Sequence, residues 1–308
     1  MEAARRRAVL CISASGVAAI LLPIAGGFRV AFLSYWPSYM MAAVLAAFLP
    51  YLWWRKMGRF ATCVETAALM FLALVIPVVL TFSAMRLNMP MADVTLQKMD
   101  AALGLSSIEA LRLMNGYPNL SWILAQSYTA FGYEILLLGP LLAIFVSQDR
   151  AYMFVTAFII LISLSALVSI AFPSHGAIIA QGHFLSEFSY INHGSAEGFI
   201  ENFDAVRNDP NFILSLKNSS GIVTFPSIHA GVAVLCALAA WPSRLLRWPL
   251  TLLNALMFAS AVTSGSHYFV DVIAGGLLAA CSIKLATAER WLPHRLTLPA
   301  SARLTQTV

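Results

Sequence analysis

Charged residues are scarce in this 308-residue chain, and their scarcity excludes a soluble domain. Only 11% of the residues are Asp, Glu, Lys or Arg, whereas 60% are apolar. A soluble domain carries about 25% charged and roughly 45–50% apolar residues, because charged side chains cover its water-facing surface. A membrane-spanning helix needs about 20 predominantly apolar residues, and the chain has several such runs. The sequence therefore predicts an all-α, polytopic membrane helix bundle.

Metal-ligand spacing, internal repeats and low-complexity tracts are also lacking. The four cysteines lie inside apolar runs and are expected to be small buried side chains: Cys11, Cys63, Cys236 and Cys281. Many transporters are built from repeated halves, so the lack of a repeat argues against that class.

The apolar runs predict about eight transmembrane helices, at residues 8–27, 37–54, 61–85, 122–147, 152–172, 227–243, 249–265 and 271–287. With the N-terminus inside, thirteen of the 19 Lys and Arg residues face the cytoplasm. The other six face the opposite side: Arg29, Arg86, Lys98, Arg112, Arg207 and Lys217. This bias predicts that both termini are cytoplasmic. The net charge of +5 follows from this topology and gives no indication of nucleic-acid binding.

Two long segments between the predicted helices fall on the outer, non-cytoplasmic face. Residues 86–121 are expected to form interfacial helices, one of them with Ser106 or Ser107 as its N-cap. Residues 173–226 form the longest loop, and loops of this length are uncommon unless they are functional or disordered. We therefore expect the functional site near residues 173–226.

Two similar sequences bound that loop. TFPSIHAG, at residues 224–231, is followed directly by an apolar run, and proline is favoured at the first position of a helix. Pro226 is therefore expected to begin the helix, with Ser227 and His229 in its first turn. The free N–H groups and the positive end of the helix dipole make such a turn a site for an anion. An interfacial histidine that contacts only water or headgroups is the alternative reading.

A second histidine lies in SGSHYFVDVIAGG, between the last two predicted spans. His267 and Asp271 are four residues apart, which places two side chains on one face of a helix. A carboxylate next to an imidazole fixes its orientation and stabilises its cationic form, so His267 is a candidate nucleophile. His229, His267 and Asp271 are all predicted at the same membrane face.

The other similar sequence, AFPSHGA at residues 171–177, ends a span rather than beginning one. His175 therefore has no helix N-terminus beneath it, and we expect a structural or substrate-contact role for it rather than catalysis. Glu134 is an ionisable residue at membrane depth, where either substrate handling or a hydrogen bond to a neighbouring helix explains its presence.

The sequences FPSIHAG and HYFVDVIAGG resemble the type 2 phosphatidic acid phosphatase superfamily, whose motifs are K-x6-R-P, P-S-G-H and S-R-x5-H-x3-D. Pro226, Ser227 and His229 match the second motif, with Ile228 in place of glycine. His267 and Asp271 match the end of the third motif.

The cationic residues of two family motifs are missing. Ser260 and Ala261 stand where the third motif has Ser-Arg, and the outer loops contain no K-x6-R-P. With these departures, and with F-P-S-x-H-A and H-Y-x-x-D-x-x-A-G both present, the sequence resembles the branch that contains inositol phosphorylceramide synthases and their bacterial relatives. The resemblance covers residues 61–288.

This resemblance implies a six-helix phosphatase-like core at residues 61–288, which includes the interfacial segment 86–121 and the outer loop 173–226. Residues 1–60 are then an additional pair of transmembrane helices, and residues 289–308 a cytoplasmic tail. The implied setting is a bacterial inner membrane with a periplasmic site, although a lumenal eukaryotic site also fits.

The resemblance also implies a reaction. His267 attacks phosphorus and forms a phosphohistidine, Asp271 orients it, and His229 protonates the leaving oxygen and then activates the acceptor. The acceptor is water in a phosphatase and an alcohol such as inositol in a phosphotransferase. The substrate is a lipid phosphate or phospholipid, and no metal or other cofactor is implied.

A transferring phosphoryl group is stabilised mainly by cationic or N–H donors, and the usual lysine and arginine are missing. Arg207 and Lys217 are the two cations of the long outer loop and therefore the candidates, with the hydroxyl and amide of Ser227 as a further contact. The sequence is also compatible with two other functions: a lipid transporter or flippase, and an inactive scaffold with the same fold.

Overall fold

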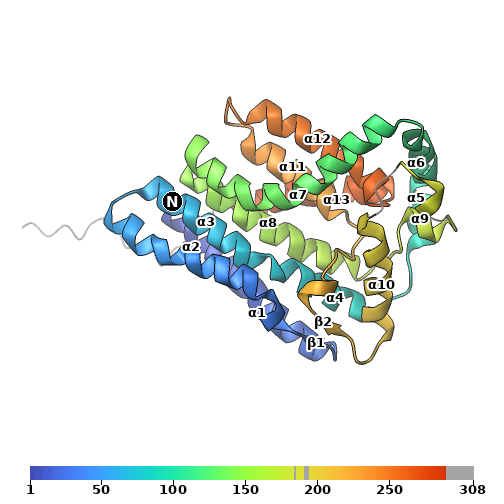
Figure 1. Ribbon diagram of the computed structural model, residues 1–308, viewed down its shortest axis with the longest axis horizontal. Coiled ribbons are helices and arrows are strands. Elements are labelled where there is room, and N and C mark those ends of the chain that lie inside the picture. Colours follow the sequence, from blue (N-terminus) through green and yellow to red (C-terminus); the bar gives the residue numbers. More distant parts are fainter. Residues whose placement is uncertain (184, 191–193, 289–308) are drawn as a thin grey trace, which may run out of the picture.

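The computed structural model describes residues 1–183, 185–190 and 194–288, most of which belong to helices that pack into one bundle (Figure 1). Within these described residues, six stretches of helix are long and apolar enough to cross a membrane: Glu2–Ala25 (α1), Phe32–Trp54 (a 3-10 turn and α2, Trp36–Trp54), Gly58–Arg86 (α3, Gly58–Ala73, and α4, Val75–Arg86), Pro118–Phe145 (α7), Gln148–Ser169 (α8) and Phe269–Thr287 (α13). The predicted all-α polytopic bundle is confirmed.

Helices also occupy the two remaining predicted spans, but neither belongs to this set of six. The helix α11 (Ile228–Ala240) is apolar but has only 13 residues, and α12 (Arg247–Ser264) has 18. Both pack against the long helices, with α11 between α8, α12 and α13. Of the eight transmembrane helices expected from the sequence, length and composition therefore support six.

The predicted span 61–85 is broken in the middle. The helix α3 ends at Ala73 and α4 begins at Val75. Proline has no backbone N–H to donate to the carbonyl four residues earlier, and Pro77 stands four residues after Ala73. The proline therefore accounts for the interruption at Leu74.

The helix α8 forms the centre of the bundle. All of its residues from 151 to 162 are buried, and it packs against α1, α3, α4, α7, α11 and α13. This segment has apolar side chains around most of its circumference, which is typical of a helix enclosed by others.

The two ends of the bundle differ. The connections at residues 87–117 and 170–227 lie at one end, on the right of Figure 1, and are called here the loop end. They contain α5 (Asp93–Ala102), α6 (Ser107–Asn115), α9 (Ala177–Ala180) and α10 (Gly194–Asn208). A two-stranded parallel sheet, β1 (Arg29–Val30) with β2 (Ile213–Leu214), joins the long loop to the α1–α2 connection; the sequence did not predict it.

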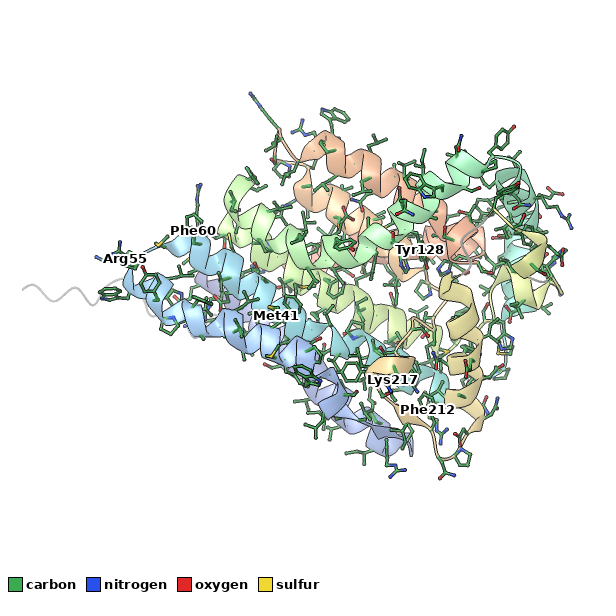
Figure 2. All side chains as sticks on the ribbon, in the orientation of Figure 1. Met41, Arg55, Phe60, Tyr128, Phe212 and Lys217 are labelled. Atoms are coloured by element: carbon green, nitrogen blue, oxygen red, sulfur yellow. The ribbon has the colours of Figure 1, made fainter. Side chains whose placement is uncertain are left out.

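The described termini meet at the opposite end. The amino group of Met1 lies 2.6 Å from Asp149 at the start of α8, and Arg7 donates to the carbonyl of Ala288, which follows α13. Figure 2 shows Arg55 and Phe60 at this opposite end, and Lys217 and Phe212 far from them. The predicted tail at residues 289–308 lies outside the described residues.

Candidate active site

His267 and Asp271 form a buried pair at the loop end. Nδ1 of His267 lies 3.3 Å from Oδ2 of Asp271, and the two residues are 3% and 0% exposed. The same Oδ2 accepts a hydrogen bond from the backbone N–H of Tyr268 at 3.0 Å. Because α13 begins at Phe269, His267 precedes the helix. The two side chains therefore meet across the helix start, not on two successive turns as the spacing suggested.

His229 lies in the first turn of α11, as predicted, but the helix begins two residues later than expected. Ser227 is the N-cap and Pro226 precedes it; the hydroxyl oxygen of Ser227 accepts from the N–H of Ala230 at 3.4 Å. The imidazole of His229 stacks on the ring of Tyr128 in α7, with centroids 3.8 Å apart and planes 12° apart. On a second side it contacts the ring of Phe131, also in α7, at 4.4 Å.

The backbones of the two motifs touch directly. The N–H of Ser227 donates to the main-chain carbonyl of Asp271 at 2.9 Å. A Cβ atom on Gly275 would lie 2.1 Å from the carbonyl oxygen of Ser227, closer than any side chain permits. A Cβ on Gly231 would lie 3.1 Å from the carbonyl oxygen of Gly275. These two glycines allow α11 and α13 to approach closely enough to bring His229 and His267 to one place.

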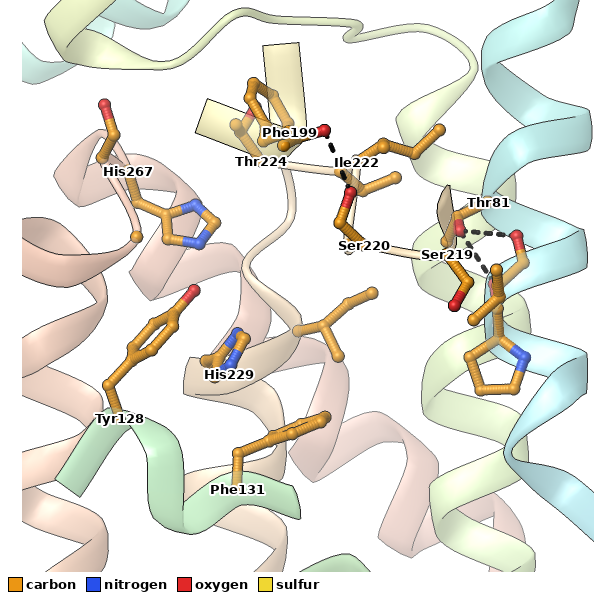
Figure 3. A pocket seen from close by; sticks show the side chains of 18 of the residues that line it. Thr81, Tyr128, Phe131, Phe199, Ser219, Ser220, Ile222, Thr224, His229 and His267 are labelled. Carbon is orange, nitrogen blue, oxygen red and sulfur yellow. Dashed lines mark hydrogen bonds between the residues drawn. The ribbon is translucent and has the colours of Figure 1, made fainter. Parts of the chain in front are cut away.

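A cavity of about 460 Å³ opens between these helices, and three histidines line it: His175, His229 and His267. Its other end is lined by apolar side chains from α4, α7 and α8 and the α3–α4 junction: Leu74, Pro77, Val78, Ile135, Phe158 and Ile162. Figure 3 shows the hydroxyl of Tyr128 directed toward His267, with His229 beside the same ring. The cavity thus has a polar end and an apolar end.

The sequence AFPSHGA packs against the segment that carries His267. The N–H of Ala177 donates to the carbonyl of Ser266 at 2.8 Å, and the N–H of Ile178 donates to the Ser266 hydroxyl at 3.1 Å. Gly176 has φ +82°, and a Cβ there would lie 2.7 Å from the Ser266 carbonyl oxygen. This glycine permits the contact, so the second copy of the motif is part of the site's framework.

His175 itself reaches the cavity. Its Nε2 lies 3.0 Å from Oδ1 of Asp204 in α10, and its ring meets the ring of Phe203 edge-on at 5.0 Å. The carboxylate and the aromatic ring fix the imidazole in one orientation at the polar end.

The two predicted phosphate-binding cations lie elsewhere. Arg207 donates to the carbonyl of Met89 at 2.8 Å and stacks over Phe203, and burial lowers its pKa. Lys217 is not among the residues that line the cavity. Among the residues described as lining the cavity, none is a lysine or an arginine. No lining lysine or arginine therefore takes the place of the missing motif cations.

Two other predicted residues also lie outside the cavity lining. Ser227 is fully buried as the N-cap of α11. Glu134 accepts a hydrogen bond from Asn254 of α12 at 2.8 Å, the helix–helix contact that was one of its two expected roles. Within the described part of the chain, no group of three or more His, Cys, Asp or Glu side chains could hold a metal ion.

Three residues at the site were not singled out from the sequence. Tyr128 gave no local signal, because its partner His229 lies a hundred residues further along the chain. Asp93 and Asp100 contact the segment 267–270 through hydrogen bonds, and their seven-residue spacing on an amphipathic stretch was the only sign of a shared face.

Comparison with known proteins gives one match. The family model described as the PAP2 superfamily matches residues 94–285, which include His175, His229, His267 and Asp271. Neither curated proteins nor solved structures returned a match. The match covers more than half of the chain and most of the segment over which the motifs resemble this superfamily. The chain belongs to the PAP2 superfamily.

Proposed function

We propose that the protein is a membrane-embedded phosphatase or phosphotransferase that acts on a lipid phosphate or phosphodiester. The observation that carries this proposal is the shared cavity. His229 and His267 both line its polar end, and Asp271 contacts Nδ1 of His267. The membership of the superfamily supports the same chemistry.

In the proposed first step, Nε2 of His267 attacks phosphorus, because Nδ1 is turned toward Asp271. A nitrogen–phosphorus bond forms and the bond from phosphorus to the leaving oxygen breaks. Asp271 stabilises the positive charge that develops on the imidazole, which is the orienting role of a carboxylate in catalytic triads. His229 donates a proton to the leaving oxygen.

In the second step, His229 takes a proton from the acceptor, whose oxygen attacks phosphorus and releases His267. General acid–base catalysis requires an imidazole held in a fixed position. The stack with Tyr128 and the contact with Phe131 supply that restraint. Water as acceptor gives hydrolysis, and an alcohol such as inositol gives transfer.

We assign the phosphate contacts to the Tyr128 hydroxyl and the imidazole of His175 rather than to Arg207 and Lys217. Both of the first two residues line the polar end, and the contact of Nε2 of His175 with Asp204 at 3.0 Å holds this imidazole in place. Hydrogen-bond donors in a site shielded from water act more strongly on developing charge than donors in water.

The apolar end of the cavity is the proposed site of the lipid's hydrocarbon chain. Side chains of α4, α7 and α8 line it, and each of these helices belongs to a stretch that is long enough to cross a bilayer: Gly58–Arg86, Pro118–Phe145 and Gln148–Ser169. The chain would therefore stay within the apolar layer while the phosphate reaches the loop end. From the distribution of Lys and Arg, we place this end on the non-cytoplasmic side and both termini in the cytoplasm.

The test is turnover by the purified protein in lipid vesicles, on a panel of phosphomonoester and phosphodiester lipids with and without inositol, read by mass spectrometry. His267→Ala and His229→Ala should each lower turnover by several powers of ten, because the groups act as a set. His183→Ala is the matched control: His183 pairs with Glu187 in the outer loop at 2.9 Å. It should keep wild-type turnover.

Unchanged turnover in both site variants would contradict the proposal. A wild-type protein that transports lipid but turns none over would indicate a transporter. A protein that does neither would indicate an inactive scaffold.

A further inference from the structure

The interfacial helix α5 contacts the start of α13 through two carboxylates. Asp93 and Asp100 are seven residues apart, which places them on the same face of α5 two turns from each other. Both side chains reach the segment that carries His267, although α5 belongs to a different connection of the bundle.

Asp100 caps α13 from outside. Its Oδ2 accepts from the N–H of Phe269 and its Oδ1 from the N–H of Val270, both at 2.9 Å. These are the first two N–H groups of the helix, which have no partner within it. Asp100 is 3% exposed, and the hydroxyl of Ser107 donates to it at 2.9 Å. A buried anion at the positive end of a helix is held strongly, since the dipole and the hydrogen bonds act together.

Asp93 contacts both of the segments that carry His175 and His267. Its Oδ1 accepts from the hydroxyl of Ser174 at 2.6 Å and lies 3.4 Å from the hydroxyl of Tyr268. Its Oδ2 accepts from the N–H of His175 at 3.3 Å. One carboxylate therefore joins the loop that carries His175 to the residue that follows His267.

The segment that carries His267 needs such restraints. His267 precedes the helix, and Ser266 has φ 55°, a left-handed conformation that non-glycine residues adopt rarely. The helix α13 therefore does not fix the position of His267 by itself. The contacts from Asp100, Asp93 and the 174–178 loop hold this segment in place.

We propose that Asp100 is a positioning residue for the reaction, and that it acts by fixing the start of α13 and thereby the orientation of the His267–Asp271 pair. Asp93 has the corresponding role for His175 and Tyr268. This inference rests on the proposed function. It adds two residues of α5 to those that determine the rate of the proposed reaction.

The experiment compares Asp100→Asn with Glu65→Gln. The control residue is also a buried carboxylate in a hydrogen-bond network, with Arg5 and Tyr152 both at 2.6 Å, but it does not line the cavity. Asp100→Asn should lower kcat by about 10²-fold, the effect of a small displacement of a reacting group, and leave KM within about twofold. Glu65→Gln should keep the wild-type kcat even if its melting temperature falls by as much as that of Asp100→Asn. Asp100→Glu, which keeps the charge, should recover part of the lost kcat.

A kcat for Asp100→Asn within about twofold of wild type, or an equal loss in Glu65→Gln, would overturn the proposal. A second measurement needs no substrate: hydrogen exchange of residues 266–271 should accelerate in Asp100→Asn and not in Glu65→Gln. Unchanged exchange would also overturn it. A wild-type protein without turnover but with this exchange difference would refute the proposed function, while it would show that Asp100 fixes the start of α13.

Discussion

The imidazole of His229 lies flat against the ring of Tyr128, with centroids 3.8 Å apart and planes 12° apart. The two residues come from the first turn of α11 and the first half of α7. Because the tyrosine hydroxyl is also directed toward His267, one side chain from α7 contacts or faces both histidines (Figure 3). We therefore expect two separable roles for Tyr128: its ring orients His229, and its hydroxyl donates a hydrogen bond to the phosphate.

Two substitutions of Tyr128 distinguish these roles. Tyr128→Phe keeps the stacked ring and removes one neutral hydrogen bond, so turnover should fall by about tenfold, or about 1.4 kcal/mol. Tyr128→Ala removes the stack as well and should lower turnover by about 10³-fold, since His229 is then free to rotate. Steady-state kinetics in vesicles measures both. Equal losses in the two variants would show that the stack contributes nothing.

The close approach of α11 and α13 can be tested at two adjacent glycines. Gly275→Ala places a methyl group 2.1 Å from the Ser227 carbonyl oxygen and forces the helices apart. Overpacking of this kind costs about 1–3 kcal/mol of stability, and it would also separate His229 from His267. We expect a lower melting temperature and a turnover reduced by about 10²-fold or more.

Gly276→Ala is the matched control. Its added methyl group meets Phe258 at 3.4 Å, an ordinary van der Waals contact. Stability and turnover should stay close to wild type, and a loss equal to that of Gly275→Ala would contradict the account of the helix contact.

The apolar end of the cavity predicts a dependence on chain length. Ile135→Trp fills part of the space assigned to the hydrocarbon chain, so turnover of long-chain lipids should fall by about tenfold. Turnover of a short-chain, water-soluble analogue should change little, because its phosphate still reaches the histidines.

Leu137→Trp provides the comparison, since Leu137 is on the same helix but 55% exposed on its outer side. This variant should treat long and short chains as the wild type does. A fall in Ile135→Trp that is the same for all chain lengths would contradict the assignment of the apolar end.

The residues whose placement followed from the sequence are those whose signal is local. The apolar runs predicted the membrane helices, and the segments after them predicted that His229, His267 and Asp271 would lie at one end of the bundle. Ser106 was one of two candidates for the N-cap of α6, and its hydroxyl oxygen accepts from the N–H of Glu109. Each of these inferences needs only residues within a few turns of one another.

The remaining features depend on which distant segments meet. No pattern near Tyr128 indicates that it stacks on His229, and none near Asp100 indicates that it caps α13. Arg207 and Lys217 were selected as the cations of the long loop, yet neither lines the cavity. The break at Leu74 was not predicted either. The apolar run around Pro77 predicted one continuous span, but the proline has no N–H to donate, and the span is divided into two helices.

The most direct test of the central claim is a search for the covalent intermediate. The protein is mixed with its turned-over lipid, quenched within milliseconds in alkali, digested and examined by mass spectrometry. We predict a phosphorus adduct on His267 in the wild-type protein and its disappearance in His267→Asn. Turnover that persists in His267→Asn, or an adduct on any other residue, would contradict the account.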